Sequence, residues 1–356
     1  MWHVTNISDL AKIIFIFWKF SGLPVFHSEN SIGDRKNSYF FWLILFLQVA
    51  FCGLYMTFIV LPHNFNDYVG FLQLAVLYFH NFVLILHFWR KRKGLVFTFS
   101  KILVLERTVL YFTRKKLNCD KITKFLICYK ALQFSVTLGV FISSLCLTTR
   151  TTEGIVFNLC NFLGSFLAFN FETLLLFFLS VLNELYLQFN CGLKRSLSYF
   201  QVLKVYFLLQ EAINDVIKLL QIQLLLKVSS DWVITISTLF YVLKQLQNHS
   251  LPSENLLILV AVIWPAFILM STFLMAFYCE KIEQQENTMA NILTQVKIVP
   301  SYKRLNLLAL RLEIKPIRFT IYELCPLNCT FINMMIVGMA TYLIYLFQFS
   351  QMKQIG

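Results

Sequence analysis

Seven apolar stretches, each about as long as a bilayer-crossing helix, constrain this chain more than any other feature. A hydrocarbon core needs about 20 apolar residues of helix to cross it. Soluble domains are about 25% charged, whereas only 14% of these 356 residues are charged and 58% are apolar. The sequence therefore predicts an all-α membrane protein with seven transmembrane helices. The predicted spans are Tyr39–Leu61, Val69–Trp89, Phe125–Leu147, Val156–Leu182, Leu224–Leu246, Leu256–Tyr278 and Cys329–Phe349.

Charged residues inside the predicted spans need partners, because an unpaired charge in a bilayer is costly. Lys227 and Asp231 interrupt the start of the fifth span and are four residues apart. They can pair along one helical turn, or the membrane begins after them. Glu172 lies inside the fourth span, and Lys130 in the third, at a similar depth, is a candidate partner.

The loop charges predict the orientation of the chain. Of the 28 Lys and Arg residues outside the spans, 26 fall in the N-terminal segment and the second, fourth and sixth loops. Since cytoplasmic loops carry the excess of Lys and Arg, we expect a cytoplasmic N-terminus and an extracellular C-terminus. This orientation disfavours a G-protein-coupled receptor. It also explains the net charge of +13 by contact with anionic membrane lipid, without nucleic acid.

Several other classes are disfavoured by the motifs. The nine cysteines are scattered without a CxxC pair, and the six histidines are isolated, so we expect no metal site and no disulfide framework. The spans contain no HExxH or GxSxG motif, so we expect neither an enzyme nor a cofactor. The run Ile13–Trp18 is too short for a signal-peptide core.

The loop lengths indicate where a ligand can bind. The predicted outer loops are too short for an extracellular domain, so a ligand must enter between the helices. The longer inner loops include the amphipathic stretch 301–314, which predicts helices that project inward and pack together. Helices lying on the lipid surface are the alternative.

The last span has one polar face. At 100° per residue, Thr341, Tyr342, Tyr345 and Gln348 share an arc of about a third of the circle, with Phe349 at its edge. Polar groups facing lipid are unfavourable, so the arc is expected to face a water path, with Phe349 as a hydrophobic constriction. Alternatively, Gln348 lies at the level of the lipid headgroups.

This C-terminal stretch resembles the insect gustatory receptors. That family ends in Thr-Tyr, five apolar residues and Gln-Phe, which are Thr341, Tyr342, LIYLF, Gln348 and Phe349 here. The upstream run FTIYELCPLNCTFINMMIVGMA, the N-terminal KFSGLPVF and the block at 212–226 are also similar to the family. Sugar receptors of the family commonly carry Glu after Thr-Tyr, whereas this chain has Leu343.

The resemblance implies a ligand-gated, non-selective cation channel in the plasma membrane of chemosensory neurons. Four copies, identical or mixed with sister receptors, would surround a pore lined by Thr341, Tyr342 and Tyr345 and gated by Gln348 and Phe349, without a G protein. Leu343 favours bitter or other non-glucose tastants. The family binds tastants in the outer half of the helical bundle. Candidate ligand contacts at that depth are Gln73, Tyr78, Asn158, Asn161, Tyr241 and Trp264; interfacial anchoring and helix packing are the alternative roles for these residues.

The chain then divides into a cytoplasmic segment (1–38), six ligand-binding helices with their loops (39–278), cytoplasmic anchor helices (279–328), a pore helix (329–349) and an extracellular tail (350–356). An odorant-receptor subunit of the same superfamily and a secondary transporter remain as alternatives. A transporter should show an internal repeat, and we find none.

The orientation can be tested with epitope tags. A tag after Gly356 should be labelled on intact cells, and a tag before Met1 should be labelled only after permeabilisation. Asn248 belongs to the N-x-S triplet that we place outside, so any glycan should be lost in Asn248→Gln. Labelling of the N-terminal tag on intact cells would contradict the orientation.

Overall fold

The structure is a computed structural model. It describes residues 6–19, 26–28, 31–32, 43, 46–47, 50, 65–147, 152–193, 199–247, 252–295 and 317–355. The first predicted span lies outside these residues except for positions 43, 46, 47 and 50, which are helical. The amphipathic stretch 301–314 and Asn248 lie outside them entirely.

Helices make up almost all of the described chain. They are α1 (Ile7–Lys19), α3 (Phe65–Arg90), α4 (Arg92–Thr113), α5 (Cys119–Leu147), α6 (Thr152–Leu193), α7 (Tyr199–Gln247), α8 (Pro252–Gln295) and α10 (Cys329–Ile355). Two short antiparallel pairs join β1 (Phe26–Ser28) to β2 (Ser31–Ile32) and β3 (Thr320–Ile321) to β4 (Cys325–Pro326). Six helices are long and apolar enough to cross a membrane: α3, α5, α6, α7, α8 and α10. They coincide with the second to seventh predicted spans, so the all-α membrane fold is confirmed.

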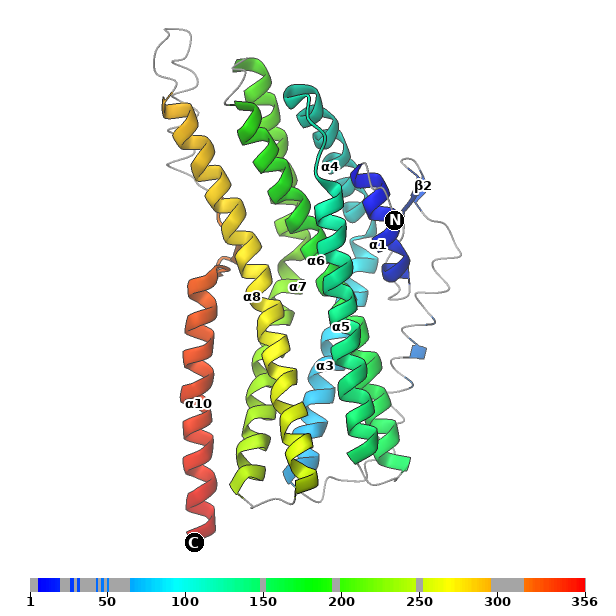
Figure 1. Cartoon of the computed structure of the whole chain (residues 1–356), viewed down its shortest axis with the longest axis vertical. Coiled ribbons are helices and arrows are strands. Elements are labelled where there is room, and N and C mark those ends of the chain that lie inside the picture. The colour runs from blue at the N-terminus through cyan, green and yellow to red at the C-terminus, as the bar shows by residue number, and fades with distance from the viewer. Residues whose placement is uncertain are drawn as a thin grey trace.

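Three of the helices are much longer than a bilayer is thick. Helices α6, α7 and α8 have 42, 49 and 44 residues, which is roughly 60–75 Å at 1.5 Å per residue. Figure 1 shows their extra length gathered with α4 at the end of the bundle opposite the C-terminus. This packing is consistent with the expected inward-projecting helices, which stay a prediction.

Helix α6 forms the centre of the bundle and α10 stands at its edge. In the most apolar 18-residue window of each helix, 94% of α6 is buried within the chain but only 17% of α10. One continuous core extends from α1 to Ile332 in the first turn of α10, and includes the stacked rings of Phe88 and Phe171 with centroids 5.6 Å apart. In Figure 1, α10 runs alongside α7 and α8 with its other side uncovered.

Gly192, near the end of α6, allows that helix to approach the end of α4 closely. A Cβ atom on Gly192 would lie 2.7 Å from Thr113 Cγ2 and 2.9 Å from Phe112 Cε1. Helix α4 ends just beyond this contact, where Arg114 adopts the left-handed conformation (φ 53°) and its N–H donates to the Leu110 carbonyl. The close contact therefore fixes α4 against the cytoplasmic half of α6.

We expect Gly192→Ala to lower the free energy of unfolding by about 1–3 kcal/mol, because the methyl group overpacks the contact. Gly94→Ala in α4 is the matched control, since no atom lies within 4 Å of a Cβ placed there. The control should be neutral or stabilising by up to about 1 kcal/mol. Thermal unfolding of the purified protein in detergent measures both changes. Equal melting temperatures for the two variants would contradict the close packing at Gly192.

Candidate functional site

Helix α7 carries a row of polar side chains into the apolar bundle. Lys227, Asp231, Thr235, Thr238 and Tyr241 are three or four residues apart, so they lie on one face of the helix. The first four are buried and Tyr241 is partly buried. Because lipid offers no hydrogen bonds, such groups must be satisfied within the protein.

At the inner end of this row, Lys227 bridges two carboxylates. Its Nζ lies 2.5 Å from Glu172 Oε1 on α6 and 2.7 Å from Asp231 Oδ2 one turn along α7. All three side chains are at most 5% exposed. The pairing of Lys227 with Asp231 is as predicted. The prediction that Lys130 pairs with Glu172 was wrong, because the Lys227 ammonium binds this carboxylate.

The two carboxylates also accept hydrogen bonds from side chains of neighbouring helices. Glu172 Oε2 accepts from the side chains of Ser271 (2.7 Å), Gln133 (3.0 Å) and Tyr129 (3.3 Å), and Asp231 Oδ2 accepts from Thr272 Oγ1 (2.5 Å). The donors come from α5 and α8. The network of Glu172, Lys227 and Asp231, called the buried ionic network below, therefore joins four of the six apolar helices.

The predicted ligand contacts lie on the outer side of this network. Gln73 Nε2 on α3 donates to Ser237 Oγ (3.0 Å) and Thr238 Oγ1 (2.9 Å) on α7, so the structure brings these helices together through polar groups. Tyr78 OH donates to the Cys160 carbonyl at 3.2 Å.

The other predicted ligand contacts lie on α6, α7 and α8. Asn158 is buried, and Asn161 and Tyr241 are partly exposed. The Trp264 ring lies 5.8 Å from that of Phe169.

Two faces of α10 are distinguished by their packing. Leu343 and Leu346 pack with Met335 and Met339 against Ile236 of α7. The predicted polar arc is uncovered: Thr341 and Gln348 are exposed, Tyr345 is 57% exposed, and Tyr342 is half-exposed beside Trp232. Ile344 is also exposed, so the aliphatic face is only partly packed within one chain. Phe349 lies in α10, but its side chain is outside what the structure describes.

Three glutamates of α8 hold the segment that leads into α10, a feature that the sequence analysis missed. The backbone N–H groups of Ile317, Phe319 and Cys329 donate to the carboxylates of Glu286 (2.5 Å), Glu283 (2.9 Å) and Glu280 (3.2 Å), respectively. The spacing of three residues places the glutamates along one face of α8. This glutamate row ties the start of α10 to α8.

The buried ionic network generates a stability prediction. Lys227→Met should lower the free energy of unfolding by about 3–5 kcal/mol, because two carboxylates lose their buried cation. Lys218→Met, at an exposed position of the same helix, is the control and should change stability by less than about 1 kcal/mol. Thermal unfolding in detergent compares the two variants. The network would have no stabilising role if both behaved alike.

The structure of the chain is similar to that of an insect olfactory receptor. The olfactory receptor OR5 from Machilis hrabei matches with a TM-score of 0.73 over 96% of this chain and 98% of its own, at 13% sequence identity. The structure of the same receptor in complex with eugenol matches with a TM-score of 0.57 over the same shares of both chains, at 14% identity. At these identities the likeness shows a common fold.

Sequence comparison places the chain in a family. No curated protein sequence matches it significantly. The family described as 7tm Chemosensory receptor matches residues 11–353, which is nearly the whole chain. The predicted membership of the insect chemoreceptor superfamily agrees with this match and with the fold of OR5. The chain belongs to the 7tm chemosensory receptor family.

Proposed function

We propose that the protein is a gustatory receptor that acts as a ligand-gated, non-selective cation channel in the plasma membrane of chemosensory neurons. Four copies, of this chain alone or with other gustatory receptors, surround a pore lined by α10. The observation that carries the proposal is the uncovered polar arc of α10, on the helix that the chain buries least. Neighbouring copies would cover its exposed apolar residues and leave the arc facing water.

The ligand in this proposal is a small-molecule tastant bound among α3, α6, α7 and α8. Gln73, Tyr78, Asn158, Asn161, Tyr241 and Trp264 are the proposed contacts. The related OR5 has been solved with eugenol, which supports a small aromatic molecule as a ligand for this fold. Leu343, in place of the Glu of sugar receptors, favours a bitter or other non-glucose ligand.

Helix α8 offers a route from the ligand site to the pore. Ser271 and Thr272 bind the buried ionic network, and the glutamate row begins about two turns further along the same helix. A movement of α8 on ligand binding would pull on the N–H of Cys329, the first residue of α10. In this proposal one helix, α8, joins the ligand contact Trp264 to the start of α10, and Pro265 lies within it.

An odorant-receptor subunit is the second candidate, and the similarity to OR5 is the observation that favours it. The complete Thr341-Tyr342 and Gln348-Phe349 ending favours the gustatory assignment. Expression in oocytes, alone and with co-receptors, separates the two candidates: tastants should evoke current in the first case and volatile odorants in the second. A slow carrier flux without channel-like current would instead indicate a transporter.

The gate can be tested by comparing the two faces of α10. Phe349→Ala should raise ligand-independent current, because a smaller apolar plug wets more easily. Gln348→Ala should alter conductance, since it removes a polar side chain from the open path. Leu346→Ala, on the face that packs against α7, should leave permeation nearly unchanged despite a packing loss of order 1 kcal/mol or more.

Surface expression must be measured for each variant, because any of the three can lower it. If Leu346→Ala disturbed the current as strongly as Phe349→Ala at equal surface density, the polar arc would not line the pore. A species that conducts while cross-linking shows only monomers would contradict the assembly of four copies.

A further inference from the structure

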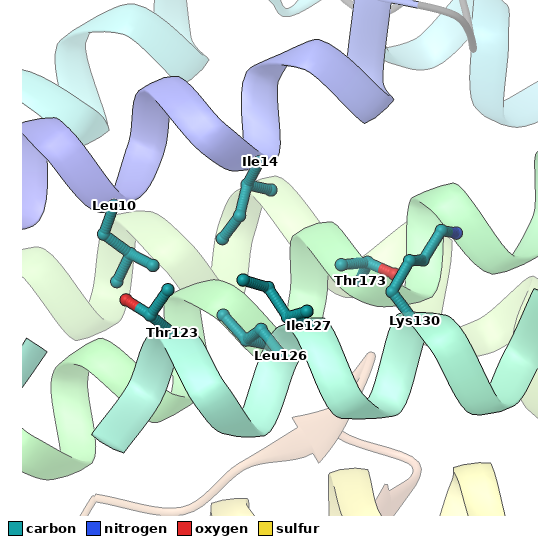
Figure 2. A pocket seen from close by; sticks show the side chains of 7 residues that line it. All are labelled: Leu10, Ile14, Thr123, Leu126, Ile127, Lys130 and Thr173. Carbon is teal, nitrogen blue, oxygen red and sulfur yellow. The ribbon is translucent and has the colours of Figure 1, made fainter. Parts of the chain in front are cut away.

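Buried ionisable side chains outside the buried ionic network include Lys130 on α5 and Glu286 on α8. Lys130 lies at one end of a narrow gap beneath α1, whose walls are mainly aliphatic side chains of α1 and α5 (Figure 2). Its ammonium reaches the ionic network through Gln133, which donates to Glu172. Glu286 forms no ion pair with a Lys or Arg of the described chain, so its charge needs another explanation.

Glu286 is the most buried member of the glutamate row. The residue is 1% exposed, whereas Glu280 and Glu283 are partly exposed. Its carboxyl oxygen Oε2 accepts the N–H of Ile317. The other oxygen, Oε1, is buried and has no hydrogen-bond partner among the described residues. An ionised carboxylate here would leave its charge uncompensated and one oxygen unbonded, and both are costly in a buried position.

The described groups around Glu286 supply no positive charge to it. Glu283 lies one turn away on the same helix, and its negative charge disfavours the ionisation of Glu286. Tyr186 of α6 is close enough to interact electrostatically with Glu286 and with Tyr206 of α7, and the Tyr186 hydroxyl is buried without a hydrogen-bond partner. Arg318 is exposed and interacts with Glu283. A proton is therefore the cation that this site can accept.

The proton affinity of Glu286 depends on whether the segment before α10 covers it. Glu286 lies beyond Tyr278, where the sixth predicted span ends, by about 12 Å of helix. Burial raises the pKa of Glu286 from the ordinary 4.5 to about 7; the Ile317 N–H opposes this rise and the charge of Glu283 adds to it. Release of the segment into water would return the pKa toward its ordinary value. The attached form thus binds the proton more tightly, so attachment is favoured at low pH and weakened as the pH rises through about 7.

We propose that Glu286 is a proton-binding site that controls how firmly the segment 317–329 is held on α8. With the proton bound, the carboxyl is neutral and stays buried while it accepts the N–H of Ile317. Without the proton, the carboxylate gains hydration when the segment lifts from α8. The Leu327 N–H donates to the Phe319 carbonyl at 2.7 Å, and this contact passes a loss of attachment on to the start of α10.

The proposal concerns attachment and does not require α10 to line a pore. If α10 does line one, cytoplasmic pH would tune the gating, and that consequence alone rests on the proposed function. Hydrogen–deuterium exchange of the purified full-length protein in nanodiscs measures attachment without current. A failure of the proton site and a failure of the channel proposal are therefore seen separately.

Peptides that cover 317–329 report the attachment, after their exchange rates are corrected for the intrinsic effect of pH. A pKa of about 7 in the attached form and 4.5 in the released form predicts that protection falls about tenfold between about pH 6 and about pH 8. Peptides from the centre of α6 should keep their protection over this range. An equal loss of protection in α6 would assign the effect to unfolding of the whole chain and would overturn the proposal.

Variants identify the titrating group. Glu286→Gln has the shape of the protonated carboxyl and cannot release a proton, so the protection of the segment should no longer change with pH. Glu280→Gln is the matched control: it removes an equivalent acceptor at a partly exposed position and should lower protection near Cys329 while the tenfold pH effect remains. The wild-type titration stands even if Glu286→Gln fails to fold. Wild-type protection that is constant or rises with pH, or an undiminished pH effect in Glu286→Gln, would overturn the proposal.

Discussion

The arrangement of the bundle depends on the two ion pairs that the Lys227 ammonium makes. The ammonium lies between Glu172 on α6 and Asp231 on α7, both buried, and neighbouring helices add further buried polar side chains. Helices in lipid gain little from apolar contact with each other, because the lipid chains are equally apolar. A charged network can be satisfied only in one relative position of its helices, so it specifies their rotation as well as their proximity. Hydrogen bonds from Ser271 and Gln133 extend that constraint to α8 and α5.

The same constraint explains why α10 differs from the other helices. Among its described side chains, none joins the buried ionic network, and its packing on α7 is mainly apolar and includes Met335, Met339 and two leucines. Apolar contacts of this kind tolerate sliding and rotation better than a satisfied ionic network does. The fixed point of α10 is instead its first residue, Cys329, which the glutamate row holds on α8. A helix fixed at one end and loosely packed along its length is suited to the movement that gating requires.

Hydropathy and loop charge were enough to predict the spans, because a long helix that crosses a bilayer must be apolar for about 20 residues. Six of the seven predicted spans correspond to observed helices. The partner of Glu172 could not be predicted in the same way. Lys130 and Lys227 lie at similar depths, and depth gives no information about which side of the bundle each faces. The row of glutamates at 280, 283 and 286 was visible in the sequence, but the backbone N–H groups that it binds come from a segment 31 to 49 residues away.

The wrong prediction for Lys130 is also informative about its role. A lysine whose only task was to neutralise Glu172 would be redundant, because Lys227 already does so at 2.5 Å. The bundle therefore contains a second buried ammonium close to an occupied carboxylate, where a cation costs free energy unless something else binds it. The Lys130 ammonium lies 3.5 Å from Gln133 Oε1, and Gln133 Nε2 donates to Glu172, so Lys130 reaches the buried ionic network through Gln133.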